Sequence, residues 1–184
     1  MRCFYAVEPN AEALVFLESQ KAACRHLDWA QKVRWTKPDE MHMTLKFLGD
    51  GVTDSAVAGL IEVMRTVAVT HPRRFNCVLH QASFFPNPLH PRVVVCRVAR
   101  NPTLMGWVRM IEEQTVRLGV PAERKDYSGH ITLGKCTEGF SDRASLEPGL
   151  VSMTLEVGRI GLFQSELTNG GAVYSELGHV ELTA

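Results

Sequence analysis

The sequence His42-Met43-Thr44-Leu45 returns in the second half of the chain as His130-Ile131-Thr132-Leu133. Both copies read as strands, and side chains along a strand point alternately to opposite faces of the sheet. The histidine and the threonine of each copy therefore share one face, whereas the two apolar residues point into a core. Two such strands brought together would place two imidazoles and two hydroxyls around one pocket. The repeat predicts a single active site built from both halves of the chain.

Composition indicates a globular protein of one domain spanning residues 1–184. The 184 residues are 45% hydrophobic and 22% charged, close to the averages of globular domains. No apolar run is long enough to span a bilayer, and no signal-peptide core follows the first strand, so we expect a cytoplasmic protein without membrane contact. Twenty basic and twenty acidic residues give a net charge of zero, which disfavours a broad grip on long nucleic acid. A small anionic group remains a plausible ligand.

The sequence predicts neither a metal site nor another cofactor. The five cysteines are widely spaced and form no C-x-x-C pair, so we expect reduced, buried thiols. Neither histidine motif has an H-x-H or H-E-x-x-H pattern or a carboxylate cluster beside it. A G-x-S-x-G nucleophile elbow is also absent from the sequence.

Strands and helices are predicted in an order that repeats a strand-and-helix unit before each histidine strand, which indicates an α+β fold. We expect two pseudo-symmetric lobes, with one His-x-Thr strand from each lobe. Asn169-Gly170-Gly171 predicts a hairpin turn, and Phe84-Phe85-Pro86-Asn87-Pro88 a loop. Helices are expected from Asn10 to His26, from Thr53 to just before His71, and from Asn101 to Gly119. Strands are expected at Arg2 to Val7, Val33 to Trp35, Met41 to Leu48, Phe75 to Leu79, Arg92 to Val98, His130 to Leu133, Val151 to Phe163, and Ala172 to Leu177.

A pair of histidines in one pocket suits displacement at phosphorus, because the pKa of imidazole lies near neutrality. One histidine takes a proton from water and the other gives one to the leaving alkoxide. Thr44 and Thr132 would donate hydrogen bonds to the non-bridging oxygens. Lys46 has the parity of His42 and Thr44, so it could reach the same phosphate; an exposed strand lysine is the equally weighted alternative.

These motifs resemble the two-histidine phosphoesterases, and within them the bacterial RNA 2′,3′-cyclic phosphodiesterases, also called 2′-5′ RNA ligases. The resemblance covers nearly the whole chain and includes further landmarks outside the two motifs. They are Phe4-Tyr5-Ala6-Val7, Trp35, Thr44-Leu45-Lys46-Phe47-Leu48-Gly49, Phe84-Phe85-Pro86, Pro91-Arg92-Val93-Val94, and Leu162-Phe163-Gln164-Ser165-Glu166-Leu167.

The resemblance implies a fold of two α+β lobes with antiparallel sheets around a central cleft. It also implies hydrolysis of a ribose 2′,3′-cyclic phosphate at an RNA end, or on a nucleotide, to a 2′-phosphomonoester. By motif position His42 would protonate the departing 3′ oxygen and His130 would activate water. The chain departs from the family's Arg-x-Phe-x-Pro and Ala-Arg patterns around the second motif, with Lys125-Asp126-Tyr127-Ser128-Gly129 and Gly134-Lys135. Lys135 keeps a charge for phosphate without the bidentate fork of arginine. Tyr127 could stack on a base.

Other functions remain open from sequence. The same site could serve 2′-5′ ligation or a small cyclic nucleotide. A binding module would hold RNA ends without turnover, and a structural domain would use the histidines only for packing. We expect a monomer, because no coiled-coil seam or long apolar edge is evident.

Overall fold

The computed structural model describes residues 1–184 except 138–139, 141–145, 147–150 and 169–170. Its strands form one antiparallel sheet in the order β7-β4-β5-β6-β3-β1-β8-β9, with β2 paired to the far end of β6. The helices are α1 (Ala11–Arg25), α2 (Asp54–Thr70) and α3 (Pro102–Arg117), with short 3-10 turns at Asp28–Lys32 and Pro38–Glu40. The strands are β1 (Arg2–Val7), β2 (Val33–Trp35), β3 (Met43–Gly49), β4 (Phe75–Phe85), β5 (Val93–Val98), β6 (His130–Cys136), β7 (Ser152–Val157), β8 (Arg159–Thr168) and β9 (Gly171–Glu181).

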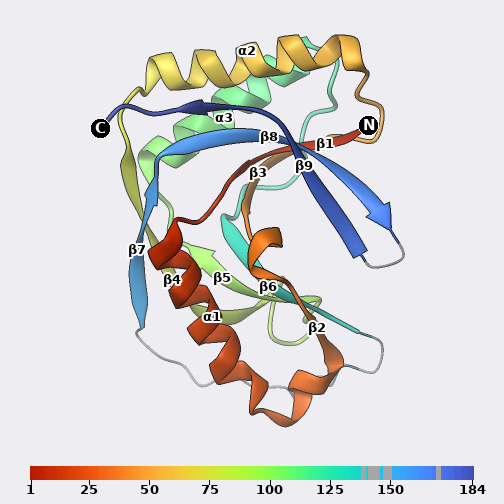
Figure 1. The fold of residues 1–184 in the computed structure, drawn as a ribbon, viewed down its shortest axis with the longest axis vertical. Coiled ribbons are helices and arrows are strands. Elements are labelled where there is room, and N and C mark those ends of the chain that lie inside the picture. The colour runs from red at the N-terminus through yellow and green to blue at the C-terminus, as the bar shows by residue number, and fades with distance from the viewer. Residues whose placement is uncertain (138–139, 141–145, 147–150, 169–170) are drawn as a thin grey trace.

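The sheet curls into two lobes that meet where β3 and β6 touch (Figure 1). Only one residue pair, Met43 with Ile131, joins these two strands in register. The first lobe holds β1, β3, β8 and β9, and the second holds β2, β4, β5, β6 and β7. Each lobe thus contributes one histidine strand, as the repeat predicts. The α+β class and the two-lobed arrangement are confirmed.

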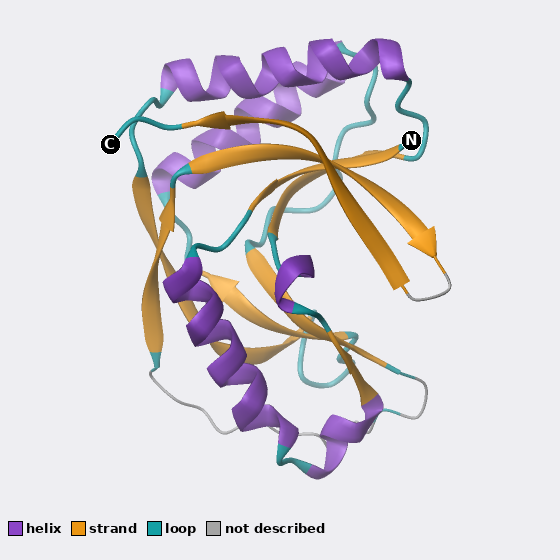
Figure 2. Cartoon of the chain, in the orientation of Figure 1, coloured by secondary structure: helices purple, strands orange, loops and turns teal. Residues whose placement is uncertain are grey.

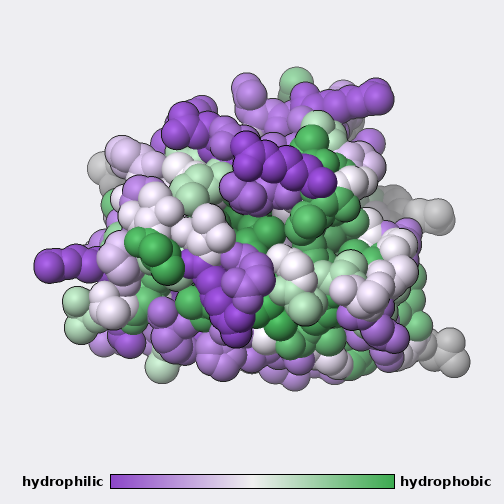
Figure 3. All heavy atoms as spheres, turned by 90° about the horizontal axis from the view of Figure 1, so that it is seen from above, coloured by the Kyte–Doolittle hydropathy of each residue, from purple (hydrophilic) through white to green (hydrophobic). Residues whose placement is uncertain are grey.

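The helices cover the outer faces of the sheet (Figure 2). Helices α2 and α3 pack against each other and on strands of the first lobe, whereas α1 packs on β4 and β7 of the second. Asn10 caps α1 by accepting a hydrogen bond from the Ala13 amide at 2.9 Å. Figure 3 looks onto the face formed by α2, where hydrophilic side chains surround smaller apolar patches. Within the part of the chain that the structure describes, no helix combines the length and the apolar character needed to cross a membrane.

One buried cluster runs through both lobes and includes Tyr5, Leu17, Met43, Trp107 and Ile131. The apolar partners of both motifs, Met43 with Leu45 and Ile131 with Leu133, are at most 3% exposed. Their burial directs the alternate side chains, the histidines and threonines, to the other face of the sheet. The five cysteines are free, and four are buried.

Two predicted elements are wrong. The stretch Phe84-Phe85 is not a loop but the end of β4, because the strand continues through a bulge and Phe84 is buried. The single strand predicted from Val151 to Phe163 is two strands, β7 and β8, separated at Gly158. Strands β8 and β9 pair antiparallel up to Thr168 opposite Gly171. The predicted Asn169-Gly170 turn lies outside the described residues.

Candidate active site

Both histidines line one pocket of about 300 Å³ between the lobes. His42 directly precedes β3 and His130 is the first residue of β6. Thr44 and Thr132 line the same pocket. The structure therefore brings together the four side chains that the repeated motif singles out.

Each imidazole is held by the same kind of hydrogen bond, to the carbonyl oxygen two residues before it. His42 Nδ1 lies 2.8 Å from the carbonyl oxygen of Glu40, and His130 Nδ1 lies 2.7 Å from that of Ser128. A carbonyl oxygen can only accept, so each Nδ1 carries the proton and donates it. In both rings Nε2 is left as the nitrogen that can give or take a proton in the pocket.

Aromatic rings fix the planes of both imidazoles. Phe4 stacks on His42 with centroids 4.8 Å apart, and Phe85 stacks on His130 with centroids 4.7 Å apart. Tyr174 from β9 meets His42 edge-on at 5.0 Å and 86°. Each ring is thus restrained both by a hydrogen bond in its plane and by packing on its face, which is the preorganisation that proton transfer needs.

Burial lowers the pKa of both histidines from the ordinary value of 6.5. The pKa of His42 is lowered further by the nearby His130 and Lys135, and the bond to the Glu40 carbonyl opposes the shift. The pKa of His130 is lowered also by Arg97 and raised by the Ser128 carbonyl. Desolvation disfavours the charged ring in each case. Burial therefore favours the neutral form of each histidine.

Each histidine strand carries a β-bulge directly after its threonine. Two consecutive residues of β1 face Thr44 and Lys46, so that Leu45 is the extra residue of β3. Two consecutive residues of β5 likewise face Thr132 and Gly134 of β6. The bulges break the strict alternation, and the next side chain to enter the pocket lies five residues after the histidine instead of four.

The predicted placement of Lys46 is therefore wrong. Its side chain is 5% exposed and points away from the pocket, where Nζ donates to Glu112 Oε2 at 2.5 Å and to the Pro121 carbonyl at 3.3 Å. Phe47 lines the pocket in its place. At the equivalent position of the second strand stands Lys135, which also lines the pocket.

The stacking role predicted for Tyr127 is also wrong. Its ring packs against the core, and its hydroxyl donates to the Thr44 carbonyl at 3.1 Å. Burial raises the pKa of this phenol above its usual range. Tyr127 is absent from the pocket lining and supports the strand of the first motif from behind.

Sequence reasoning missed several residues of the pocket wall. Arg34, Lys37 and Tyr174 line it, together with Trp35 and Phe47, which the sequence marked only as parts of family landmarks. Phe47 enters the pocket because of the bulge in β3, and the sequence carries no signal for that bulge. Among the described residues, no group of three or more His, Cys, Asp or Glu side chains lies in an arrangement that could hold a metal ion.

The fold and this arrangement of two motifs are those of the two-histidine phosphoesterases. The family model described as LigT like Phosphoesterase matches residues 17–95, a span that contains the first motif. A protein of Methanothermobacter thermautotrophicus named RNA 2′,3′-cyclic phosphodiesterase is 30% identical over 156 residues, covering 79% of this chain and 80% of that protein. A protein of the same name from Archaeoglobus fulgidus is 28% identical over 96% of this chain and 98% of its own length. The chain belongs to this family of LigT-like phosphoesterases.

Solved structures have the same fold. TT0787 of Thermus thermophilus superposes with a TM-score of 0.83 at 23% identity, covering 99% of this chain and 98% of that chain. LigT of E. coli complexed with 3′-AMP has a TM-score of 0.76 at 24% identity, covering 100% of this chain and 98% of that chain. At these identities the likeness supports the two-lobed fold.

Proposed function

We propose that this chain hydrolyses the 2′,3′-cyclic phosphate at the 3′ end of an RNA to a 2′-phosphomonoester. The observation that carries the proposal is the matched pair of Nδ1 hydrogen bonds, which leaves Nε2 of both His42 and His130 for one shared pocket. The names of the curated relatives support this substrate class.

In the proposed reaction, Nε2 of neutral His130 takes a proton from water as the water oxygen attacks phosphorus. The bond from phosphorus to the 3′ oxygen breaks, and protonated His42 gives its Nε2 proton to that oxygen. The products are a 2′-phosphate and a free 3′ hydroxyl. Each proton transfer contributes typically ~10²–10⁴ in rate. The assignment of acid to His42 and base to His130 follows the family pattern, since the two rings are held alike.

Thr44, Thr132 and Lys135 would hold the non-bridging oxygens of the phosphate. The three residues line the pocket beside the two histidines. Hydroxyl and ammonium donors placed there stabilise the negative charge that increases on these oxygens in the transition state. We further propose that residues 1–184 act as a single domain; a cytoplasmic monomer remains a prediction from sequence.

The test is incubation of an RNA oligonucleotide ending in a 2′,3′-cyclic phosphate with the protein in EDTA, beside His42→Ala and His130→Ala. We expect a 2′-phosphate product from the wild type and its loss in both variants. Circular dichroism of each variant controls for folding. A folded wild type that forms no product, or a product bearing a 3′-phosphate, would overturn the proposal. If either histidine variant were as active as the wild type, the paired mechanism would be excluded.

A further inference from the structure

The two walls of the pocket differ in chemistry although their strands are built alike. The fifth residue after the histidine enters the pocket on both strands, and it is Phe47 on β3 but Lys135 on β6. Phe4 lies against Phe47 and Tyr174, with ring centroids 5.8 and 5.3 Å away. The first lobe therefore presents aromatic surface to the pocket, and the second lobe presents positive charge.

The positive wall contains a second cation directly opposite Lys135. Arg34 of β2 is the register partner of Lys135 in the antiparallel pair of β2 and β6, and both side chains are exposed in the pocket. Like charges directly opposite each other on neighbouring strands destabilise a sheet. Phosphate groups bound at these two cations would reduce that repulsion.

Nearby carboxylates do not neutralise this pair. Glu40 is the one carboxylate among the residues that line the pocket, and its Oε1 lies 3.7 Å from Nζ of Lys37. In the described part of the chain, neither Arg34 nor Lys135 forms an ion pair with a carboxylate. With neutral histidines, three cations and one carboxylate leave the lining with an excess of two positive charges, in a chain whose net charge is zero. Such a local excess in a pocket attracts anionic groups.

Arg34 lies beyond the phosphate that the histidines and Lys135 would hold. The histidine strands meet at Ile131 of β6, and Lys135 with Arg34 opposite it lies four residues further along that strand. At about 3.3 Å per residue this is roughly 13 Å of strand. Arg34 is thus displaced from the reacting centre along β6, toward the end of β6 that pairs with β2.

Resting on the proposed function, in which Lys135 holds the cyclic phosphate, we propose that Arg34 binds the phosphodiester that precedes the terminal nucleotide. In an RNA chain this is the next anion after the cyclic phosphate, and a guanidinium can contact two of its oxygens at once. The subsite makes RNA chains better substrates than free cyclic mononucleotides. It also sets the direction in which the RNA leaves the pocket, across β2.

The test compares two dinucleotides that end in the same 2′,3′-cyclic phosphate, one joined by a phosphodiester and one by an uncharged methylphosphonate. For the wild type we expect kcat/KM to favour the phosphodiester about tenfold, as one charge-assisted contact provides. In Arg34→Gln this ratio falls to near one, and in Arg34→Lys it is intermediate. Arg117→Gln, an exposed arginine of α3, is the matched control and keeps the wild-type ratio.

A wild-type ratio near one, or an unchanged ratio in Arg34→Gln, would overturn the subsite. Binding of the same two dinucleotides ending in a 2′-phosphate, measured by calorimetry, separates this outcome from failure of the proposed function. A wild type without turnover that still binds the phosphodiester more tightly, through Arg34, would sink the proposed hydrolysis and keep the subsite. Equal binding of both dinucleotides would sink the subsite.

Discussion

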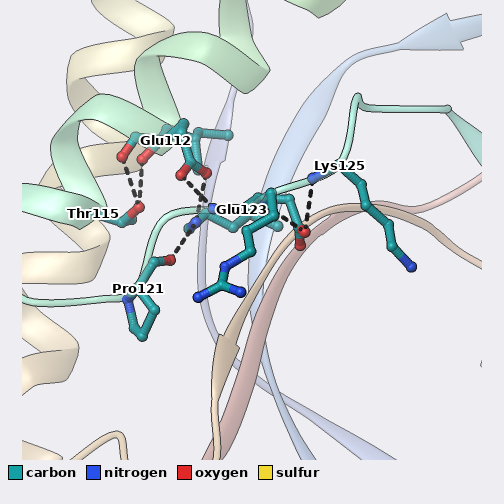
Figure 4. Close-up of polar contacts among 8 residues, drawn as sticks. Glu112, Thr115, Pro121, Glu123 and Lys125 are labelled. Atoms are coloured by element: carbon teal, nitrogen blue, oxygen red, sulfur yellow. Dashed lines mark hydrogen bonds and ion pairs between the residues drawn. The ribbon is translucent and has the colours of Figure 1, made fainter.

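Lys46 and Glu112 join the strand of the first histidine to helix α3, with Nζ 2.5 Å from Oε2. The other carboxylate oxygen of Glu112 accepts a hydrogen bond from the Glu123 amide at 2.8 Å. The contacts continue along the loop (Figure 4), where Glu123 Oε1 accepts hydrogen bonds from the amides of Arg124 and Lys125. Burial alone would raise the pKa of Glu112, but the bonds from Lys46 and the Glu123 amide outweigh it, so the pKa lies below its ordinary value.

The loop held in this way leads to the second histidine. It continues through Tyr127, whose hydroxyl donates to the Thr44 carbonyl, and Ser128, whose carbonyl orients His130. The strand of the first motif thus fastens, at Lys46 and at Thr44, the segment that sets the tautomer of the second histidine. A lysine expected to bind phosphate instead links the two half-sites.

Removal of this lysine should destabilise the protein. In Lys46→Met the Glu112 carboxylate loses its buried partner, and we expect a loss of about 1–3 kcal/mol in the free energy of unfolding, reduced from the fully buried case because Glu112 is 29% exposed. Urea unfolding measures it. The double variant Lys46→Met with Glu112→Gln should recover part of the loss. Arg65→Met, which breaks an exposed pair with Glu62, should cost less than about 0.5 kcal/mol; equal costs for Lys46 and Arg65 would contradict the linking role.

Activity should be greatest on the acid side of neutrality. The proposed reaction needs neutral His130 and protonated His42. The value of kcat/KM therefore rises with pH through the pKa of His130 and falls through the pKa of His42. Burial lowers both pKa values from 6.5, so we expect a bell-shaped profile with its optimum below about pH 6.5. An optimum at pH 8 would rule out this pairing of roles.

Lys135 offers a direct check of that profile. Its charge is one of the causes that lower the pKa of His42. In Lys135→Gln the pKa of His42 should rise, and the alkaline limb of the kcat/KM profile should move to higher pH. Lys32→Gln, an exposed lysine in the turn before β2, is the control and should leave the limb in place. If the alkaline limb stays at the same pH in Lys135→Gln, the limb reports a group other than His42.

Strict alternation along a strand was enough to predict that His42, Thr44, His130 and Thr132 face one pocket. It failed one step later, because a bulge depends on how neighbouring strands pair and leaves no mark in the local sequence. Lys46 was misplaced for this reason. Tyr127 was misplaced because a family position does not say whether a ring faces a ligand or a strand.

The close contact of β2 with β6 depends on Gly134. A Cβ there would lie 2.5 Å from Val33 Cγ1 and 3.1 Å from the Arg34 carbonyl oxygen. We expect Gly134→Ala to push β2 away and to lower the free energy of unfolding by about 1–3 kcal/mol. Urea unfolding measures this, with Gly51→Ala as the control, since a Cβ at Gly51 meets nothing within 4 Å. Equal stability of the two variants would show that β2 adjusts without cost.

Phe47 is 56% exposed although it is a large apolar side chain, and it lines the pocket on the first lobe. Stacking of a nucleic-acid base on such a ring contributes about 1–3 kcal/mol. We therefore expect Phe47→Ala to raise the KM for an RNA end by about tenfold. Its melting temperature should change little, because the exposed ring contributes little burial. Phe47→Tyr keeps the ring and should keep the KM, and Leu167→Ala, 79% exposed on β8, is the control for loss of a surface apolar group. If Phe47→Ala leaves the KM unchanged, the terminal base does not rest on this wall, and Tyr174 becomes the aromatic side chain to test.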